Sequence, residues 1–91
     1  MKLVFRVHAV QRMFERRISV QDVEDVLASG EVIEDYPHDF PFASQLHLGF
    51  VGDRSVHVVS ARNPNSDERI IITVYEPDLH EWEPGFRKRK T

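Results

Sequence analysis

Apolar side chains recur along the chain with two different periods, and the first of these, near the N-terminus, is helical. Between His8 and Arg16 the apolar residues fall on one side of a helical wheel and the polar residues on the other. Arg17 would lie in the middle of the apolar side, so we expect the helix to end there. The apolar side consists of Ala9, Val10, Met13 and Phe14. The pattern predicts an amphipathic first helix.

A second helical pattern begins at Val20 and ends near Ser29. Ser19 followed by Asp22 resembles a capping box with Asp in place of the usual Glu, and carboxylates in the first turns suit the positive end of the helix dipole. The apolar arc of this helix consists of Val20, Val23, Val26 and Leu27. We expect Gly30 to take the left-handed conformation that often closes a helix.

After Gly30 the apolar residues follow the shorter period of extended chain. The predicted strands cover residues 31–36, 45–50, 56–59 and 69–75. The segment from Pro37 to Pro41 breaks regular structure, whereas Gly52-Asp53 supplies the turn of a hairpin. The last run is β-branched almost throughout, which predicts a strand buried on both faces in the middle of a sheet.

The order of these elements predicts an α+β fold in which two N-terminal helices pack on a roughly four-stranded antiparallel sheet. The sequence does not decide whether Leu3 to Val7 form an extra strand. A chain of 91 residues favours one domain with one core. We expect an ordered core over residues 3–86, onto which Trp82 and Phe86 pack, and a basic tail, residues 87–91, that frays.

The composition excludes several classes of site. The chain has no cysteine, so it forms no disulfide and no thiolate metal centre. Its histidines lack the spacing of metal ligands, and phosphate-binding glycine loops are absent, so we expect neither metal nor cofactor. Arg6 and Arg12 interrupt the apolar N-terminus far short of a signal peptide or membrane span, which favours the cytoplasm and no membrane partner.

The net charge of −3 conceals a strong sorting of charges along the chain. Residues 1–17 carry five basic side chains and one carboxylate, a balance of +4. Residues 18–53 carry eight carboxylates and no Lys or Arg, and the remainder comes to +1. This sorting predicts a polarised molecule with a basic face suited to phosphates, although charges that serve solubility alone would give the same sequence.

A stripe of His8, Arg12 and Arg16 runs along the polar side of the first helix, where the three heads could converge on one ligand. Guanidinium groups suit a phosphate, and an imidazole can transfer a proton near neutral pH, which is the chemistry of RNA cleavage without metal. An ordinary solvated face, with Glu15 paired to one of the arginines, would have the same residues. Spacing alone favours that second interpretation.

Four further residues are candidates from chemistry. His57 lies inside an apolar strand, where it could act as a general acid or base or be a hydrogen-bonded core histidine. Tyr75, at the end of a strand, could stack on a base or pack in the core. Arg62 and Arg69 flank the last connection between strands and could bind an RNA backbone or mark solvent-facing strand ends.

Four segments carry a family resemblance. Residues 8–18 read HAxxRMxERxI, residues 23–33 read VxxVLxSGEVI, and HVV and ITVYEPD follow at 57–59 and 72–78. These motifs resemble a bacterial domain family of unknown function. The resemblance implies a fold similar to the RelE/ParE toxin superfamily, in which two N-terminal helices pack on an antiparallel sheet.

By this resemblance the chain would be the toxin of a type II toxin-antitoxin pair, a metal-independent endoribonuclease acting on mRNA, with or without the ribosome. Its partner would be a small cognate antitoxin. The family pattern assigns the catalytic positions to His8, Arg12, Arg16, His57 and Tyr75. The acidic net charge departs from the strongly basic ribonucleases of that superfamily, and the alternative is a non-catalytic protein-interaction module of the same fold. The oligomeric state is open.

Overall fold

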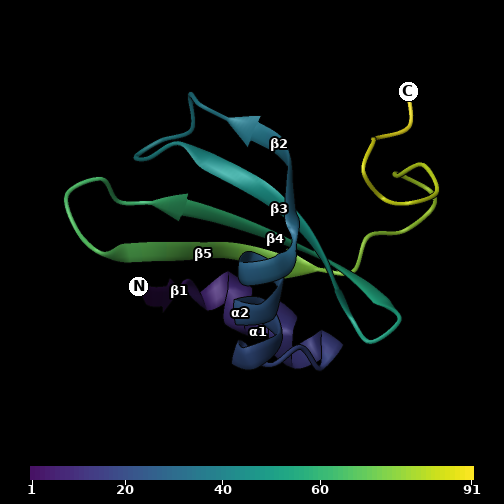
Figure 1. Cartoon of the computed structure of the whole chain (residues 1–91), viewed down its shortest axis with the longest axis horizontal. Coiled ribbons are helices and arrows are strands. Elements are labelled where there is room, and N and C mark those ends of the chain that lie inside the picture. The colour runs from purple at the N-terminus through teal and green to yellow at the C-terminus, as the bar shows by residue number, and fades with distance from the viewer.

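The computed structural model describes all 91 residues and places two helices against one face of a five-stranded sheet (Figure 1). In chain order the elements are β1 (Lys2–Phe5), α1 (Val7–Arg16), α2 (Val20–Ser29), β2 (Glu31–Tyr36), β3 (Ser44–Val51), β4 (Arg54–Arg62) and β5 (Glu68–Tyr75). The strands lie side by side in the order β1-β5-β4-β3-β2. The α+β class and the two N-terminal helices are confirmed.

The sheet differs from the expected four antiparallel strands in having a fifth. The N-terminal strand that the sequence left undecided is present at Lys2–Phe5. It pairs in parallel with β5, from Lys2 opposite Glu68 to Phe5 opposite Ile71. The other three pairs are antiparallel, so the sheet is mixed. Local sequence did not reveal this pairing because a parallel partner lies far along the chain, and here the whole of the intervening fold separates the two strands.

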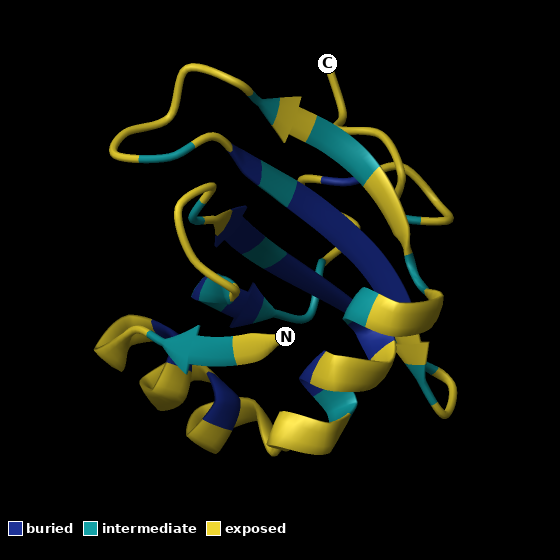
Figure 2. Ribbon diagram, turned by 60° about the vertical axis from the view of Figure 1, so that its left-hand side comes forward, coloured by how far each residue is buried: buried dark blue, intermediate teal, exposed yellow.

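The expectation that the last strand is buried on both faces in the middle of the sheet is wrong. β4 occupies the central position, and β5 lies next to the edge strand β1. Only Ile71 and Val74 of β5 are fully buried, whereas its other residues are half-buried. Figure 2 shows the difference: the deeply buried strands are β3 and β4, and burial decreases toward both edges of the sheet.

Helix α1 ends where the sequence predicts, but its buried side is narrower. Arg17 takes a left-handed conformation with φ 54°, and the N–H of Ile18 reaches back 2.9 Å to the carbonyl of Met13. These are the features of a Schellman ending. Ala9 and Met13 are buried, whereas Val10 and Phe14 are 51% and 87% exposed. The helix packs chiefly on β5, near the sheet edge, so only a thin stripe is covered.

Helix α2 begins with the predicted capping box. The Ser19 hydroxyl accepts from the N–H of Asp22 at 3.0 Å, and the Asp22 carboxylate accepts from the N–H of Ser19 at 2.9 Å. The left-handed ending at Gly30 is wrong, since Gly30 is extended with φ −79° and leads directly into β2. Glycine is required there because a Cβ would lie 2.4 Å from the carbonyl oxygens of Val26 and Leu48.

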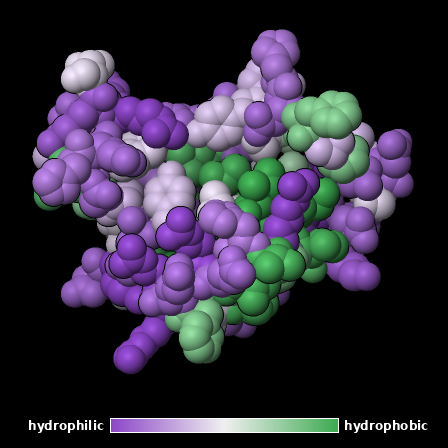
Figure 3. All heavy atoms as spheres, turned by 180° about the vertical axis from the view of Figure 1, so that it is seen from behind, coloured by the Kyte–Doolittle hydropathy of each residue, from purple (hydrophilic) through white to green (hydrophobic).

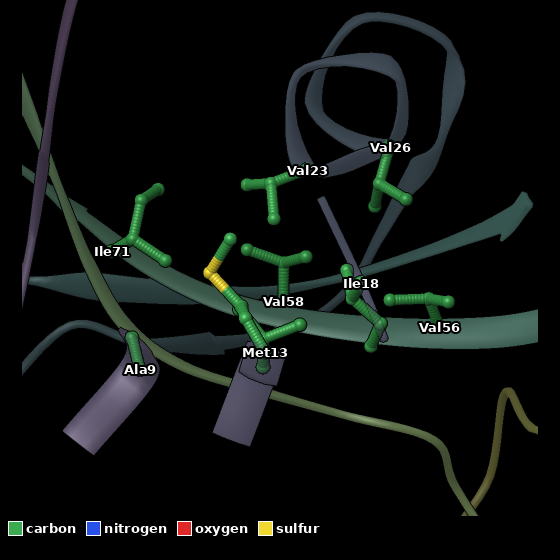
Figure 4. Packing of buried hydrophobic residues seen from close by; sticks show 9 residues of the cluster. Ala9, Met13, Ile18, Val23, Val26, Val56, Val58 and Ile71 are labelled. Carbon is green, nitrogen blue, oxygen red and sulfur yellow. The ribbon is translucent and has the colours of Figure 1, made fainter. Parts of the chain in front are cut away.

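The main core fills the space between the helices and the sheet (Figure 4). Its nine buried residues are Ala9, Met13, Ile18, Val23, Val26, Val56, Val58, Ile71 and Val74. Seen from behind, the surface gathers hydrophobic side chains in one central region with hydrophilic ones around it (Figure 3). Neither helix has the length and apolar composition needed to cross a membrane.

Candidate functional site

An open cavity of about 1020 Å³ lies at the end of the sheet where β2 and β4 finish and β3 and β5 begin. Arg62 and Arg69 both line it. They are directly opposite each other in the β4–β5 pair, so their side chains leave the sheet on the same face. The structure therefore brings together the two arginines that the sequence marked for RNA binding.

Arg69 belongs to a hydrogen-bonded group that includes one residue of β4 and one of β3. The Arg69 Nη1 lies 3.1 Å from the Ser60 Oγ and 3.4 Å from the His47 Nε2. The Ser60 Oγ in turn lies 3.2 Å from the His47 Nε2. Ser60 lines the cavity, and both Ser60 and His47 are buried. Opposite Val59 and Ser60, strand β5 has one extra residue, Ile72, and this is a bulge, a feature that often re-aims a side chain beside a functional site.

The protonation of this group follows from its donors. A guanidinium only donates, so the Nε2 of His47 accepts and the ring proton lies on Nδ1. Burial, and then repulsion from Arg69, lower the pKa of His47, while Asp35 raises it to a smaller extent. Burial and repulsion from Arg62 also lower the pKa of Arg69. His47 is therefore neutral near pH 7, beside the positive charge of Arg69.

The opposite rim of the cavity is acidic. The Asp35 carboxylate accepts a hydrogen bond from the Gln45 amide at 3.0 Å, and the Ser44 hydroxyl donates to Asp39 in the β2–β3 loop. An anion is attracted only to the arginine side. The cavity thus has one cationic side, at Arg62 and Arg69, and one anionic side, at Asp35.

His57 and Tyr75, two of the predicted catalytic residues, are in contact but covered. Val56 and Val58 belong to the helix-side core, so the intervening His57 points to the other face of the sheet. Its Nε2 lies 2.9 Å from the carbonyl of Phe86 and its Nδ1 3.2 Å from the Tyr75 hydroxyl. Since a carbonyl only accepts, Nε2 carries the proton. Both ring nitrogens are occupied, and the ring is 0% exposed.

The cover over His57 is the C-terminal segment. Trp82, 1% exposed, meets the His57 ring edge-on at 4.5 Å, and the Arg89 guanidinium lies 4.6 Å from the centre of the Trp82 ring. The Arg89 Nε also donates to the Glu34 carboxylate at 3.1 Å. Part of the basic tail that was expected to fray is therefore held against the outer face of the sheet.

Burial under this cover shifts the pKa values of both His57 and Tyr75. It lowers the pKa of His57, with the Phe86 carbonyl opposing the shift by stabilising the protonated ring. It raises the pKa of Tyr75 to about 12. His57 is fully buried and Tyr75 is half-buried. Proton transfer between the His57 ring and a ligand would therefore require the C-terminal segment to move.

The predicted stripe on α1 is exposed and lies elsewhere. His8, Arg12 and Arg16 are all solvent-facing, and Arg12 pairs with Glu15 at 3.7 Å, as an ordinary solvated helix face would. The sheet separates this helix from the side chain of His57. The seven candidate residues thus occupy three places: the outer side of α1, the covered outer face of the sheet, and the open cavity.

Three residues of these sites were not among the predicted ones: His47, Ser60 and Arg89. His47 carries the same signal as His57, an ionisable ring inside an alternating apolar strand. Its contact with Ser60 depends on the register of the β3–β4 pair. Arg89 lies in a run of basic residues that looked uniformly solvated. Only the tertiary structure distinguishes it from its neighbours.

The two buried histidines predict a loss of stability in mild acid. Both have pKa values below the ordinary 6.5, so the unfolded chain takes up protons more readily than the folded chain. Their contribution is complete above about pH 6.5 and is lost as the pH falls below it, at up to about 1.4 kcal/mol per pH unit for each ring. Urea denaturation at pH 7.5 and 5.5 measures the loss.

Two matched variants test this assignment. His47→Gln is expected to flatten the pH dependence of stability, whereas His38→Gln, at an exposed position of the β2–β3 loop, should leave it unchanged. Equal pH dependence in all three proteins would contradict a role for the buried ring.

No group of three His, Asp or Glu side chains is placed to hold a metal ion. No curated protein and no solved structure matches the chain significantly. A family model does match, over residues 5–76, and it describes a domain of unknown function, DUF4258. The match begins at the last residue of β1 and extends past the end of β5. It leaves out the C-terminal segment that covers His57. The chain therefore belongs to the DUF4258 family.

Proposed function

We propose that the protein binds the phosphate backbone of RNA through Arg62 and Arg69 and cleaves mRNA without a metal, as the toxin of a type II toxin-antitoxin pair. The observation that supports this most is the open cavity in which the two guanidiniums lie beside Ser60 and His47. Arginine pairs suit phosphate oxygens, and a cavity open to solvent can admit a single strand. The order of helices and strands agrees with the RelE/ParE-like fold that the motifs imply.

The other candidate residues have places in this proposal. The exposed His8, Arg12 and Arg16 form a separate surface, which a longer RNA or the cognate antitoxin would contact. His57 and Tyr75 would act only in a form from which the C-terminal segment has moved, because both nitrogens of the imidazole are otherwise bonded.

Removing the two cavity arginines tests the proposal. The double variant Arg62→Ala/Arg69→Ala is expected to weaken binding of a labelled single-stranded RNA at least tenfold, and to lower the slope of log affinity against log salt by about 1.4, since each phosphate contact contributes about 0.7. Fluorescence anisotropy at several salt concentrations measures both. On induced expression in a bacterium, the wild type is expected to arrest growth and the double variant to relieve it.

The control removes the same charge elsewhere. Lys88→Ala/Lys90→Ala deletes two exposed cations of the C-terminal segment that form no ion pair. Its RNA affinity should stay within threefold of the wild type. If both double variants bind RNA alike, the cavity is not the RNA site; if wild type, Arg12→Ala and His57→Ala all permit equal growth, the toxin assignment fails.

A non-catalytic interaction module is the second candidate, and one observation favours it. The side chains of Val7, Val10 and Phe14 form a second apolar stripe on α1, 73%, 51% and 87% exposed. Such a stripe is typical of a surface that a partner covers. Co-purification with the product of the neighbouring gene would support this function, whereas RNA cleavage by the isolated protein would contradict it.

A further inference from the structure

Ser60 stands between the open cavity and His47. The serine lines the cavity, whereas His47 does not, and the two are joined by the 3.2 Å contact between Oγ and Nε2. With the ring proton on Nδ1, the hydroxyl of Ser60 donates to the imidazole. The oxygen of Ser60 accepts a hydrogen bond from the Arg69 guanidinium, and both residues line the cavity.

No other group at the cavity can accept a proton near neutral pH and then release it. The ionisable residues that line it are Asp35, Arg62 and Arg69. Asp35 lies on the acidic rim and is hydrogen-bonded to Gln45. Two other histidines were candidates from the sequence. Both ring nitrogens of His57 are already hydrogen-bonded and its ring faces the other side of the sheet, and His8 lies on α1.

We propose that Ser60 and His47 form a proton relay that activates the 2′-hydroxyl of an RNA bound in the cavity. The inference rests on the proposed function. The 2′-hydroxyl passes its proton to the Ser60 oxygen while Ser60 passes its own proton to the Nε2 of His47. The 2′-oxygen then bonds to phosphorus, the bond from phosphorus to the 5′-oxygen breaks, and that oxygen takes a proton from water. The products are a 2′,3′-cyclic phosphate and a 5′-hydroxyl, and His47 returns its proton to the solvent.

The electrostatics of the cavity couple this relay to substrate binding. The charged groups that act on His47 are Arg69 on β5, which disfavours the protonated ring, and Asp35 on β2, which favours it. Ser60 on β4 is its neutral neighbour. A phosphate on Arg69 cancels the repulsion, so the pKa of His47 rises when an anion binds. The base gains strength only when substrate is present.

Two variants test the relay by activity. His47→Gln keeps a polar side chain but cannot accept and release the proton, and Ser60→Ala breaks the connection. Each is expected to lower kcat for a short single-stranded RNA at least 100-fold, with RNA affinity within threefold of wild type. The fall of kcat toward acid pH should disappear from the residual activity of His47→Gln. Ser66→Ala, an exposed serine of the β4–β5 loop, should cleave as wild type does.

The outcomes separate the relay from the proposed function. Wild-type kcat in His47→Gln or Ser60→Ala overturns the relay and leaves RNA cleavage standing. Binding without cleavage by the wild type overturns cleavage and relay together and leaves RNA binding, and absence of binding overturns the proposed function itself. An RNA with a 2′-deoxy sugar at the cleaved position should bind and stay intact; if it is cut, the relay is wrong.

A measurement on the wild type alone covers the case in which a buried variant fails to fold. NMR titration of His47 with inorganic phosphate as the probe is expected to show its pKa rising as phosphate is added. The pKa in Arg62→Ala/Arg69→Ala should not respond. An unchanged His47 titration in phosphate-saturated wild type would overturn the coupling between the cavity and the base.

Discussion

Replacing Gly30 by alanine is expected to destabilise the protein by about 3 kcal/mol or more, at the upper end of what overpacking costs. The added Cβ would lie 2.4 Å from the carbonyl oxygens of both Val26 and Leu48. These are backbone atoms of α2 and β3, so no side chain can rotate away to make room. The helix and the strand must separate. Urea denaturation, followed by the fluorescence of the single tryptophan, Trp82, measures the loss.

Gly52→Ala supplies the matched control, because it is the same chemical change at a site with no neighbour. Gly52 has φ +64° in the β3–β4 turn, and a Cβ there meets no atom within 4 Å. The expected cost is about 1 kcal/mol, from the left-handed conformation alone. If Gly30→Ala loses no more stability than Gly52→Ala, the close approach of α2 to β3 is not a constraint on this position.

The features of the fold that the sequence predicted correctly are those decided within a few residues. The capping box at Ser19, the limits of α2 and the end of α1 at Arg17 each follow from hydrogen bonds or steric preferences inside one helical turn. The hairpin around Gly52 is local in the same sense. These elements were predictable without knowledge of the sheet to which they belong.

The features that were missed all depend on partners distant in the chain. β1 was uncertain because its partner β5 begins at Glu68. Gly30 was expected to be left-handed because part of the reason for a glycine there, the carbonyl of Leu48, lies on the neighbouring strand β3, far along the chain. The exposure of Phe14 followed from where α1 sits on the sheet and not from its own pattern.

The residues of the candidate site also differ in whether local sequence or distant partners decide them. Arg62 and Arg69 were found from their position at strand ends, and their cross-strand register brings them into one cavity. The contact between His47 and Ser60 could not be predicted without the register of the β3–β4 pair. His8 and His57 were both assigned from the motif resemblance, but the sheet lies between them, so membership of one motif set did not imply a shared site here.

Trp82→Ala is expected to cost about 3 to 5 kcal/mol, because it removes the largest buried side chain and with it the anchor of the C-terminal cover. His57 would lose its edge-on partner, Arg89 the ring on which it lies, and water would reach the imidazole. The part of the pH dependence of stability that comes from His57 should therefore decrease in the same variant. Urea denaturation followed by circular dichroism at pH 7.5 and 5.5 tests both effects.

Leu79→Ala, in the same segment but 52% exposed, should change stability by less than about 1 kcal/mol. Equal midpoints for the two variants would mean that the segment contributes little to the fold and that His57 is buried by the sheet alone.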